Sequence, residues 1–225
     1  MTKTALPDKG FLSDASDNLK QMLADQATQI TLAPGDVLFE QGDEGDALYA
    51  ILSGSMEFSI LSVSGRKLSL DMMGAGAVFG EIALFDPGCR TATVTALSDS
   101  RLLRVRNADV LRHVQSHPEM ANDLIRLAGK RMRWMNRQMN EQVFLPMPTR
   151  LARKLLYLEG VGGDRHGAGL TLSQAELAEY VGATREAVSK TLSAWKKAGV
   201  IDAARKGLTI LDQDALEALA QLDEI

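Results

Sequence analysis

The chain has almost no cysteine and no long apolar run. Of its 225 residues only Cys89 is a cysteine, which excludes a disulfide within one chain, a four-cysteine zinc site and a cysteine-held iron–sulfur cluster. No apolar stretch approaches the roughly 18 residues of a membrane span, and the N-terminal residues lack the apolar centre of a secretory signal. We therefore expect a cytoplasmic protein with no membrane partner and no metal site.

Charge of one sign is not in large excess either. Lys and Arg number 25 and Asp and Glu 29, which gives a net charge of −4, so binding to nucleic acid would need a local basic patch. The charges are unevenly placed: residues 1–114 hold 10 basic and 15 acidic side chains, whereas residues 147–206 hold 10 basic and 6 acidic ones. The region near the C-terminus is therefore the candidate nucleic-acid interface.

Glycines divide the first half of the chain into short segments. A helical stretch is expected near residues 13–27, and apolar runs follow it at 37–39, 48–52, 56–63, 67–72 and 91–97. Strands of this length, separated by turn residues about every 8–12 positions, are typical of a β-sandwich or jelly roll.

One segment of this β domain, residues 79–92, carries groups suited to a phosphorylated ligand. Gly80 lets a ligand approach the backbone, and a helical turn from Glu81 would direct N–H groups at an anion. Arg90 can hold that anion with its guanidinium fork, and Thr91 adds a hydroxyl donor. Glu81 does not favour a phosphate, but it can accept a hydrogen bond from a sugar hydroxyl. The alternative is a structural ion pair between Glu81 and Arg90.

A long helix is predicted over residues 118–143, which contain one glycine and no proline after Pro118, a residue suited to a first helical turn. Alternating steps of four and three residues along it form an a/d heptad pattern, typical of two helices packed along their length. The residues of this seam are Ala121, Ile125, Ala128, Met132, Met135, Met139 and Gln142. We expect a parallel dimer through the seam, while Leu124, Leu127 and Trp134 cover the β domain of their own chain.

The C-terminal part has the pattern of a winged helix–turn–helix. Two prolines at 144–148 are expected to end the long helix and form a hinge, and a helix is predicted at 150–158. Ser173 opens a capping box for a helix to Tyr180, and Thr184 caps a second helix at 185–198 after a tight turn. Segments 200–201 and 208–211 would form a β-wing.

Part of the second helix presents groups that can contact base edges. Arg185 can bind guanine, Glu186 can accept from cytosine, and Lys190 can reach a guanine or a phosphate. Ser189 falls on the same face. Groups placed to hold phosphates, which position rather than specify, are Ser173, Gln174, Thr184 and Arg205.

The chain resembles a known family in three places. Gly-Glu-Ile-Ala-Leu at 80–84 and Arg-Thr-Ala at 90–92 resemble the phosphate-binding cassette of cyclic-nucleotide-binding domains. Thr-Arg-Glu at 184–186, followed by Lys190, is similar to the recognition helix of the cyclic-AMP receptor protein/fumarate–nitrate regulator (Crp/Fnr) family. The order of β domain, long helix and winged helix–turn–helix along the chain is also similar to that of the Crp/Fnr family.

The resemblance implies an α+β fold: a cyclic-nucleotide-binding β-roll at 1–117, a dimerisation helix at 118–145 and a winged helix–turn–helix at 146–225. It implies a homodimeric transcriptional regulator rather than an enzyme. This regulator would bind near-palindromic double-stranded DNA and RNA polymerase. The effector implied is cAMP or cGMP, with no covalently bound cofactor. The nucleotide-binding residues implied are Phe79, Gly80, Glu81, Ile82, Ala83, Arg90, Thr91, Arg131, Met135 and Asn136. Met135 and Asn136 stand where the best-known member offers two hydroxyl residues to adenine, so the identity of the base stays open.

The sequence also leaves two rival interpretations. His113 and His117 are one helical turn apart, as two zinc ligands of an enzyme could be, and His166 and Cys89 are further candidates; surface histidines are favoured instead. The other rival is a regulator of the same fold that responds to haem or a redox signal, or is constitutively active. For Cys89 the favoured interpretation is a small buried residue.

Overall fold

The computed structural model describes residues 6–7, 11–63, 65, 67–161, 172–204 and 207–221. The chain has an α+β fold and divides into two compact units, one of residues Met1–Ile60 and Asp71–Met135 and the other of Leu61–Leu70 and Asn136–Ile225. The divisions fall inside the long helix α4 (Met120–Phe144) and inside the strands β4 (Ser55–Leu61) and β5 (Lys67–Gly74), so each of these elements contributes residues to both units.

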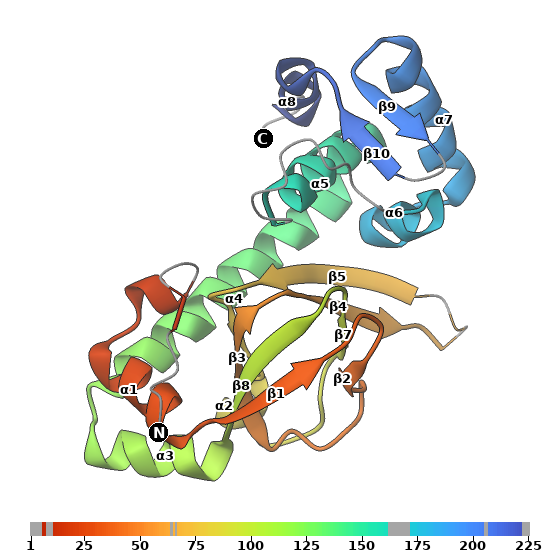
Figure 1. Cartoon of the computed structure of the whole chain (residues 1–225). Helices are drawn as coiled ribbons and strands as arrows, with labels where there is room; N and C mark the ends of the chain where they lie inside the picture. Colours follow the sequence, from red (N-terminus) through yellow and green to blue (C-terminus); the bar gives the residue numbers. More distant parts are fainter. Residues whose placement is uncertain are drawn as a thin grey trace. The chain divides into compact units, whose positions relative to one another are not determined.

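The first unit is built on two four-stranded sheets (Figure 1). In spatial order, one sheet contains β1 (Thr28–Leu32), β8 (Ser100–Arg106), β3 (Ala47–Ser53) and β6 (Val78–Phe79). The other contains β2 (Val37–Phe39), β7 (Thr93–Ala96), β4 (Ser55–Leu61) and β5 (Lys67–Gly74). Apart from the consecutive strands β4 and β5, neighbouring strands are far apart in sequence, as in a jelly roll, which confirms the predicted β domain.

An aromatic core lies between the two sheets. The rings of Tyr49 and Phe79 stack with centroids 5.3 Å apart, and Phe58 meets Phe79 edge-on at 5.0 Å. Val94 and Leu102 are fully buried beside them. Phe79, directly before the predicted cassette, is thereby fixed by packing from both sheets.

A helical layer packs against the first sheet. It is formed by the short turn Leu12–Asp14 and by α1 (Asp17–Gln26), α3 (Asn107–Ser116) and the start of α4. Leu124 and Leu127 of α4 are buried there, which confirms that they cover the β domain. The sequence did not predict β1, β6, β8 or α3. Pro118 is not in the helix but in the turn before it, where the Ala121 N–H donates to the Pro118 carbonyl at 3.0 Å.

The second unit contains the predicted helix–turn–helix and wing. Its elements are α5 (Met147–Val161), α6 (Gln174–Val181), α7 (Arg185–Lys197), β9 (Ile201–Ala204), β10 (Gly207–Ile210) and α8 (Gln213–Gln221). The capping box is present: the Ser173 hydroxyl accepts from the Glu176 N–H, and the Glu176 carboxylate accepts from the Ser173 N–H. Gly182, at φ 62°, ends α6 in the left-handed conformation that favours glycine. The Thr184 hydroxyl caps α7.

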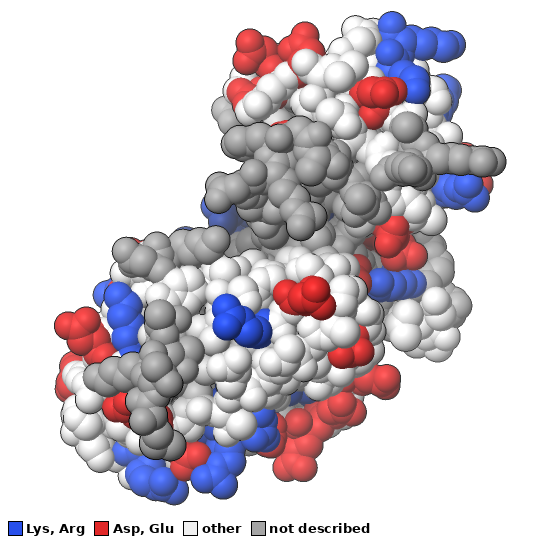
Figure 2. Space-filling model, in the orientation of Figure 1, with Lys and Arg blue, Asp and Glu red and all other residues white. Residues whose placement is uncertain are grey.

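Two elements of this unit differ from expectation. α5 begins at Met147 rather than at residue 150, because Pro148 lies in its first turn, where the missing N–H leaves no hydrogen bond unmade. α8 was not predicted; its Leu216 is fully buried, and Arg153 of α5 donates to the Ala220 carbonyl at 2.8 Å. Figure 2 shows acidic side chains over α8 and basic side chains over α7. No helix in the described part of the chain is both long and apolar enough to cross a bilayer.

Candidate functional site

A small pocket of about 60 Å³ opens in the β-roll beside α2 (Ile82–Phe85). Its wall consists of the predicted cassette, aromatic residues of the strands and one residue of α4. The lining residues are Phe39, Phe58, Phe79, Gly80, Glu81, Ile82, Ala83, Cys89, Arg90, Thr91, Ala92, Val94 and Arg131. The structure thus brings together every predicted nucleotide-binding residue except Met135 and Asn136, which do not line the pocket.

Gly80 is required where the chain enters this pocket. Its φ is +89°, and a Cβ there would lie 2.7 Å from the Ala47 carbonyl oxygen and 3.0 Å from a terminal nitrogen of Arg90. Backbone conformation and lack of space therefore both exclude a side chain, as the sequence predicted for a close approach.

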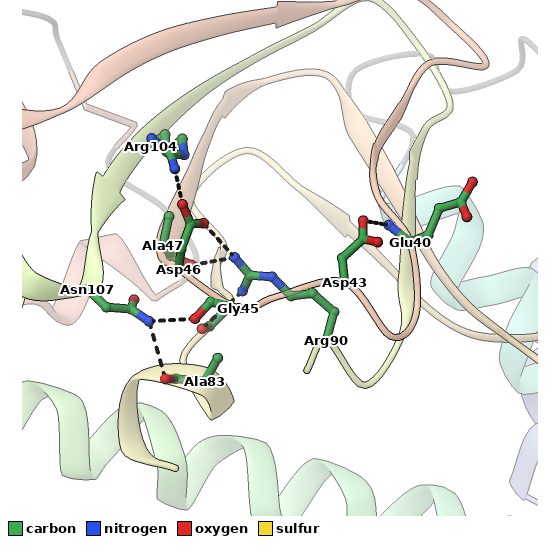
Figure 3. A network of polar contacts seen from close by, with 10 residues as sticks. Glu40, Asp43, Gly45, Asp46, Ala47, Ala83, Arg90, Arg104 and Asn107 are labelled. Atoms are coloured by element: carbon green, nitrogen blue, oxygen red, sulfur yellow. Dashed lines mark hydrogen bonds and ion pairs between the residues drawn. The ribbon is translucent and has the colours of Figure 1, made fainter. Parts of the chain in front are cut away.

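Arg90 is a buried cation in the pocket wall (Figure 3). Nη2 donates to the Ala47 carbonyl at 3.0 Å and lies 3.6 Å from the Asp46 carboxylate, while the guanidinium carbon is 4.3 Å from the Phe39 ring centre. Its Nε is buried without a hydrogen-bond partner among the described residues. A buried donor without a partner is unfavourable, so this guanidinium has capacity left to bind an anion.

Glu81 is the buried anion of the same pocket, 3% exposed. Its Oε1 accepts from Arg131 Nε at 3.3 Å, and Arg131 Nη1 lies 3.6 Å from Asp71 Oδ2. Among the described residues, the ion pairs join Glu81 to Arg131 and Arg90 to Asp46. The direct Glu81–Arg90 ion pair that the sequence left open is not formed.

Cys89 is exposed, so the expectation of a buried residue was wrong. It follows the exposed residues Asp86, Pro87 and Gly88, in a loop whose side chains project away from the core.

The rings of His113 and His117 stack at 4.9 Å, and His166 lies outside the described residues. No group of three or more potential ligands forms a metal site in the described ranges.

The predicted seam of α4 is largely uncovered on the single chain. Ile125, Met132, Met135 and Met139 are 68, 65, 54 and 61% exposed. Ala121 and Ala128 are half-buried beside them, and Gln142 is exposed. Dimerisation through the seam stays a prediction.

The predicted recognition face of α7 is largely exposed to solvent. Arg185, Glu186 and Lys190 are exposed and Ser189 is half-buried. Val188, Leu192 and Trp195 are buried, as predicted for the inward face. Of the predicted phosphate contacts, Ser173 and Thr184 are exposed and Gln174 is half-buried, whereas Arg205 lies outside the described residues.

Sequence reasoning missed several residues that shape the pocket. Phe39, Asp46 and Asp71 belong to or adjoin strands that approach the cassette only in the folded chain. No spacing pattern relates them to residues 79–92, so a single sequence offers no signal for them.

Comparison with known proteins agrees with this architecture. Residues 29–117 match the family model of the cyclic nucleotide-binding domain, and residues 149–219 match the Crp-like helix-turn-helix domain. Together they define the class: a DNA-binding transcriptional regulator that carries a cyclic nucleotide-binding domain.

Full-length relatives identify the family. The chain is 33% identical over 204 residues to the CRP-like cAMP-activated global transcriptional regulator of Mycobacterium tuberculosis, covering 88% of this chain and 91% of that one. It is 31% identical to the cyclic AMP receptor protein of Thermus thermophilus, covering 83% and 85%. A crystal structure of a CRP-family transcriptional regulator from Thermus thermophilus superposes with a TM-score of 0.73 at 26% identity, covering 86% and 96%. The chain belongs to the Crp/Fnr family of transcriptional regulators.

Proposed function

We propose that the protein is a homodimeric, sequence-specific transcriptional regulator of the cytoplasm whose DNA binding is controlled by a cyclic purine nucleotide, cAMP or cGMP. One observation carries this proposal: Glu81 and Arg90, two buried groups of opposite charge, line the same small pocket. Arg90 would hold the cyclic phosphate, assisted by Thr91, and Glu81 would accept from the ribose hydroxyl. The name of the Mycobacterium tuberculosis relative, a cAMP-activated regulator, supports the same ligand class.

Ligand binding would replace the protein partners of Arg90 and Glu81 by groups of the nucleotide. Arg90 is held by Asp46, and Glu81 is held by Arg131 of α4. A phosphate would compete with Asp46 for the guanidinium, and a ribose hydroxyl would compete with Arg131 for the carboxylate. Because Arg131 lies on α4, a change in its partner is a means of moving the long helix.

A ligand strengthens DNA binding only if it binds the DNA-competent arrangement better than the resting one. In our proposal the difference is closure of α4 over the base, transmitted through residues 144–148. A two-fold dimer would then place two α7 helices in major grooves about 34 Å apart. Arg185, Glu186 and Lys190 would read a TGTGA-like half-site, and the bound dimer would contact RNA polymerase.

Calorimetric titration with cAMP and with cGMP tests the ligand, and selection from random DNA in the presence of each nucleotide tests the output. We expect saturable binding of at least one nucleotide and recovery of a symmetric site. Absence of binding at millimolar concentration would overturn control by a cyclic nucleotide. The absorption spectrum of the protein would then test the rival interpretation, a regulator of the same fold that responds to haem, because bound haem gives a Soret band.

A further inference from the structure

Asn107 joins three segments around the pocket, although it does not line it. It is the first residue of α3, directly after β8. Its side-chain Nδ2 donates to the Gly45 carbonyl at 3.1 Å and to the Ala83 carbonyl at 3.2 Å, as Figure 3 shows. Its backbone N–H donates to the Asp46 carbonyl at 2.8 Å. One residue therefore fixes the loop before β3 and the helix α2 to the start of α3.

The loop that Asn107 holds is also the support of Arg90. The Gly42 N–H donates to the Arg90 carbonyl at 2.9 Å, and the Arg90 N–H donates to the Asp43 carbonyl at 2.7 Å. Asp46 and the Ala47 carbonyl receive the Arg90 guanidinium. A change in the position of this loop would therefore move the cation that faces the pocket.

The loop before β3 packs so closely against α2 that there is no room for a side chain at Gly45. A Cβ on Gly45 would collide with the Ala83 Cβ and would lie 2.8 Å from the Gly88 carbonyl oxygen. The Asn107 carboxamide lies across this contact, with Oδ1 buried and without a hydrogen-bond partner in the part of the chain that the structure describes. An unpaired buried acceptor is unfavourable, and its presence shows that the orientation of the amide is set by the two carbonyls that Nδ2 binds.

We propose that Asn107 is a positioning residue of the pocket: its carboxamide sets the separation between the loop that holds Arg90 and the helix that begins after Glu81, and thereby sets the affinity for the ligand. The proposal rests on the proposed function.

The test compares Asn107→Asp with Asn107→Ala and with Val110→Ala, a variant of a fully buried residue of the same helix. Asn107→Asp replaces the Nδ2 donor group by a carboxylate oxygen that faces two carbonyl oxygens, and Asn107→Ala removes the whole carboxamide without adding a charge. We expect both to lower nucleotide affinity at least about tenfold. Val110→Ala should lower the melting temperature but leave nucleotide affinity within about twofold of wild type, because the Asn107 hydrogen bonds to Gly45 and Ala83 remain.

Amide hydrogen exchange without nucleotide gives a readout that is independent of the ligand. We expect the amide protons of Gly45 and Arg90 to exchange faster than in wild type in both Asn107 variants. In Val110→Ala their exchange rates should equal those of wild type. If Asn107→Asp does not fold, Asn107→Ala carries the test. Wild-type affinity and exchange in a folded Asn107 variant would overturn the proposal, as would an equal loss of affinity in Val110→Ala. If wild-type protein binds neither nucleotide, the proposed function fails, and the exchange rates alone decide whether Asn107 positions the loop.

Discussion

Arg131 donates from Nε to Glu81 Oε1 across 3.3 Å, so a buried ion pair joins the long helix to the pocket. The Arg131 side chain is 18% exposed and that of Glu81 is 3% exposed. Arg131 also lies over the Trp134 ring, 5.2 Å from its centre, which holds the guanidinium on α4. The Arg131 guanidinium therefore links the pocket to the helix that carries the predicted dimer seam.

Arg131→Gln should destabilise the first unit, because the buried Glu81 carboxylate would lose its cation. Removal of one partner of a buried pair costs about 3–5 kcal/mol, and the residual exposure of Arg131 places the effect at the lower end. Urea unfolding would measure it. Arg133→Gln, an exposed change on the same helix, serves as the control. An unfolding free energy equal in both variants would show that the ion pair contributes nothing.

Arg90→Ala should weaken nucleotide binding severely without unfolding the domain. Loss of a charge-assisted contact costs about 1.5–3 kcal/mol, or about 10- to 150-fold in affinity. Titration calorimetry measures the affinity and circular dichroism checks the fold. Arg101→Ala, which removes a similar charge from an exposed position on β8, should bind as wild type does. Equal affinity in the two variants would exclude Arg90 as the phosphate ligand.

Met132→Glu should disfavour dimerisation, because it would place two like charges in the seam of a parallel pair. Arg133→Glu introduces the same side chain one position away from the seam and should remain dimeric. Light scattering at micromolar concentration distinguishes the two. A monomeric wild-type protein, with and without nucleotide, would contradict the prediction.

Arg185→Ala and Arg205→Ala should affect DNA binding in different ways. The first should cost about 1–3 kcal/mol and relax preference at one base pair, whereas the second should weaken all sequences alike and reduce the salt dependence. Binding to a panel of single-base variants at several salt concentrations measures both effects. Loss of affinity without any change in base preference in Arg185→Ala would assign that residue to the phosphates.

Asp109 predicts how the stability of the first unit depends on acid. Hydrogen bonding from Arg106, with Arg112 adding its charge, holds the pKa of Asp109 below its usual value of 3.8. Because the folded-state pKa is depressed, this contribution is present above pH 3.8 and is lost as pH falls through the folded-state pKa. Asp109→Asn should therefore melt below wild type at pH 7, and the difference should shrink as the pH falls below 3.8 and through the folded-state pKa of Asp109. A difference that does not change with pH would contradict this assignment.

The sequence was most informative where the signal is local. The Ser173 capping box and the Thr184 cap each lie within four residues, and both are present where predicted. The cassette was found for the same reason, since residues 79–92 are contiguous. α8 was missed although Leu216 and Ala220, one turn apart, are both buried.

Contacts between distant segments were beyond reach of the sequence. β1 pairs with β8 across about seventy residues, with Thr28 opposite Arg104, and Arg131 meets Glu81 across fifty. Such pairs depend on the register of the folded sheets and on helix packing. The exposure of Cys89 was likewise set by the loop that contains it rather than by its residue type.

The first helix has a role that truncation would reveal. α1 packs its buried Leu19, Met22 and Leu23 in the cluster that contains Leu124 and Leu127 of α4, and the Ser16 N–H donates to the buried Asp123 carboxylate at 3.3 Å. The exposed methionines Met132, Met135 and Met139 lie on later turns of α4. A chain that begins after residue 26 would therefore expose the apolar residues at the start of α4 as well as the seam, and the predicted second copy would cover only the seam. Such a shortened protein should precipitate or recruit chaperones, so limited digestion near the N-terminus would remove the regulator from solution rather than release a smaller active one.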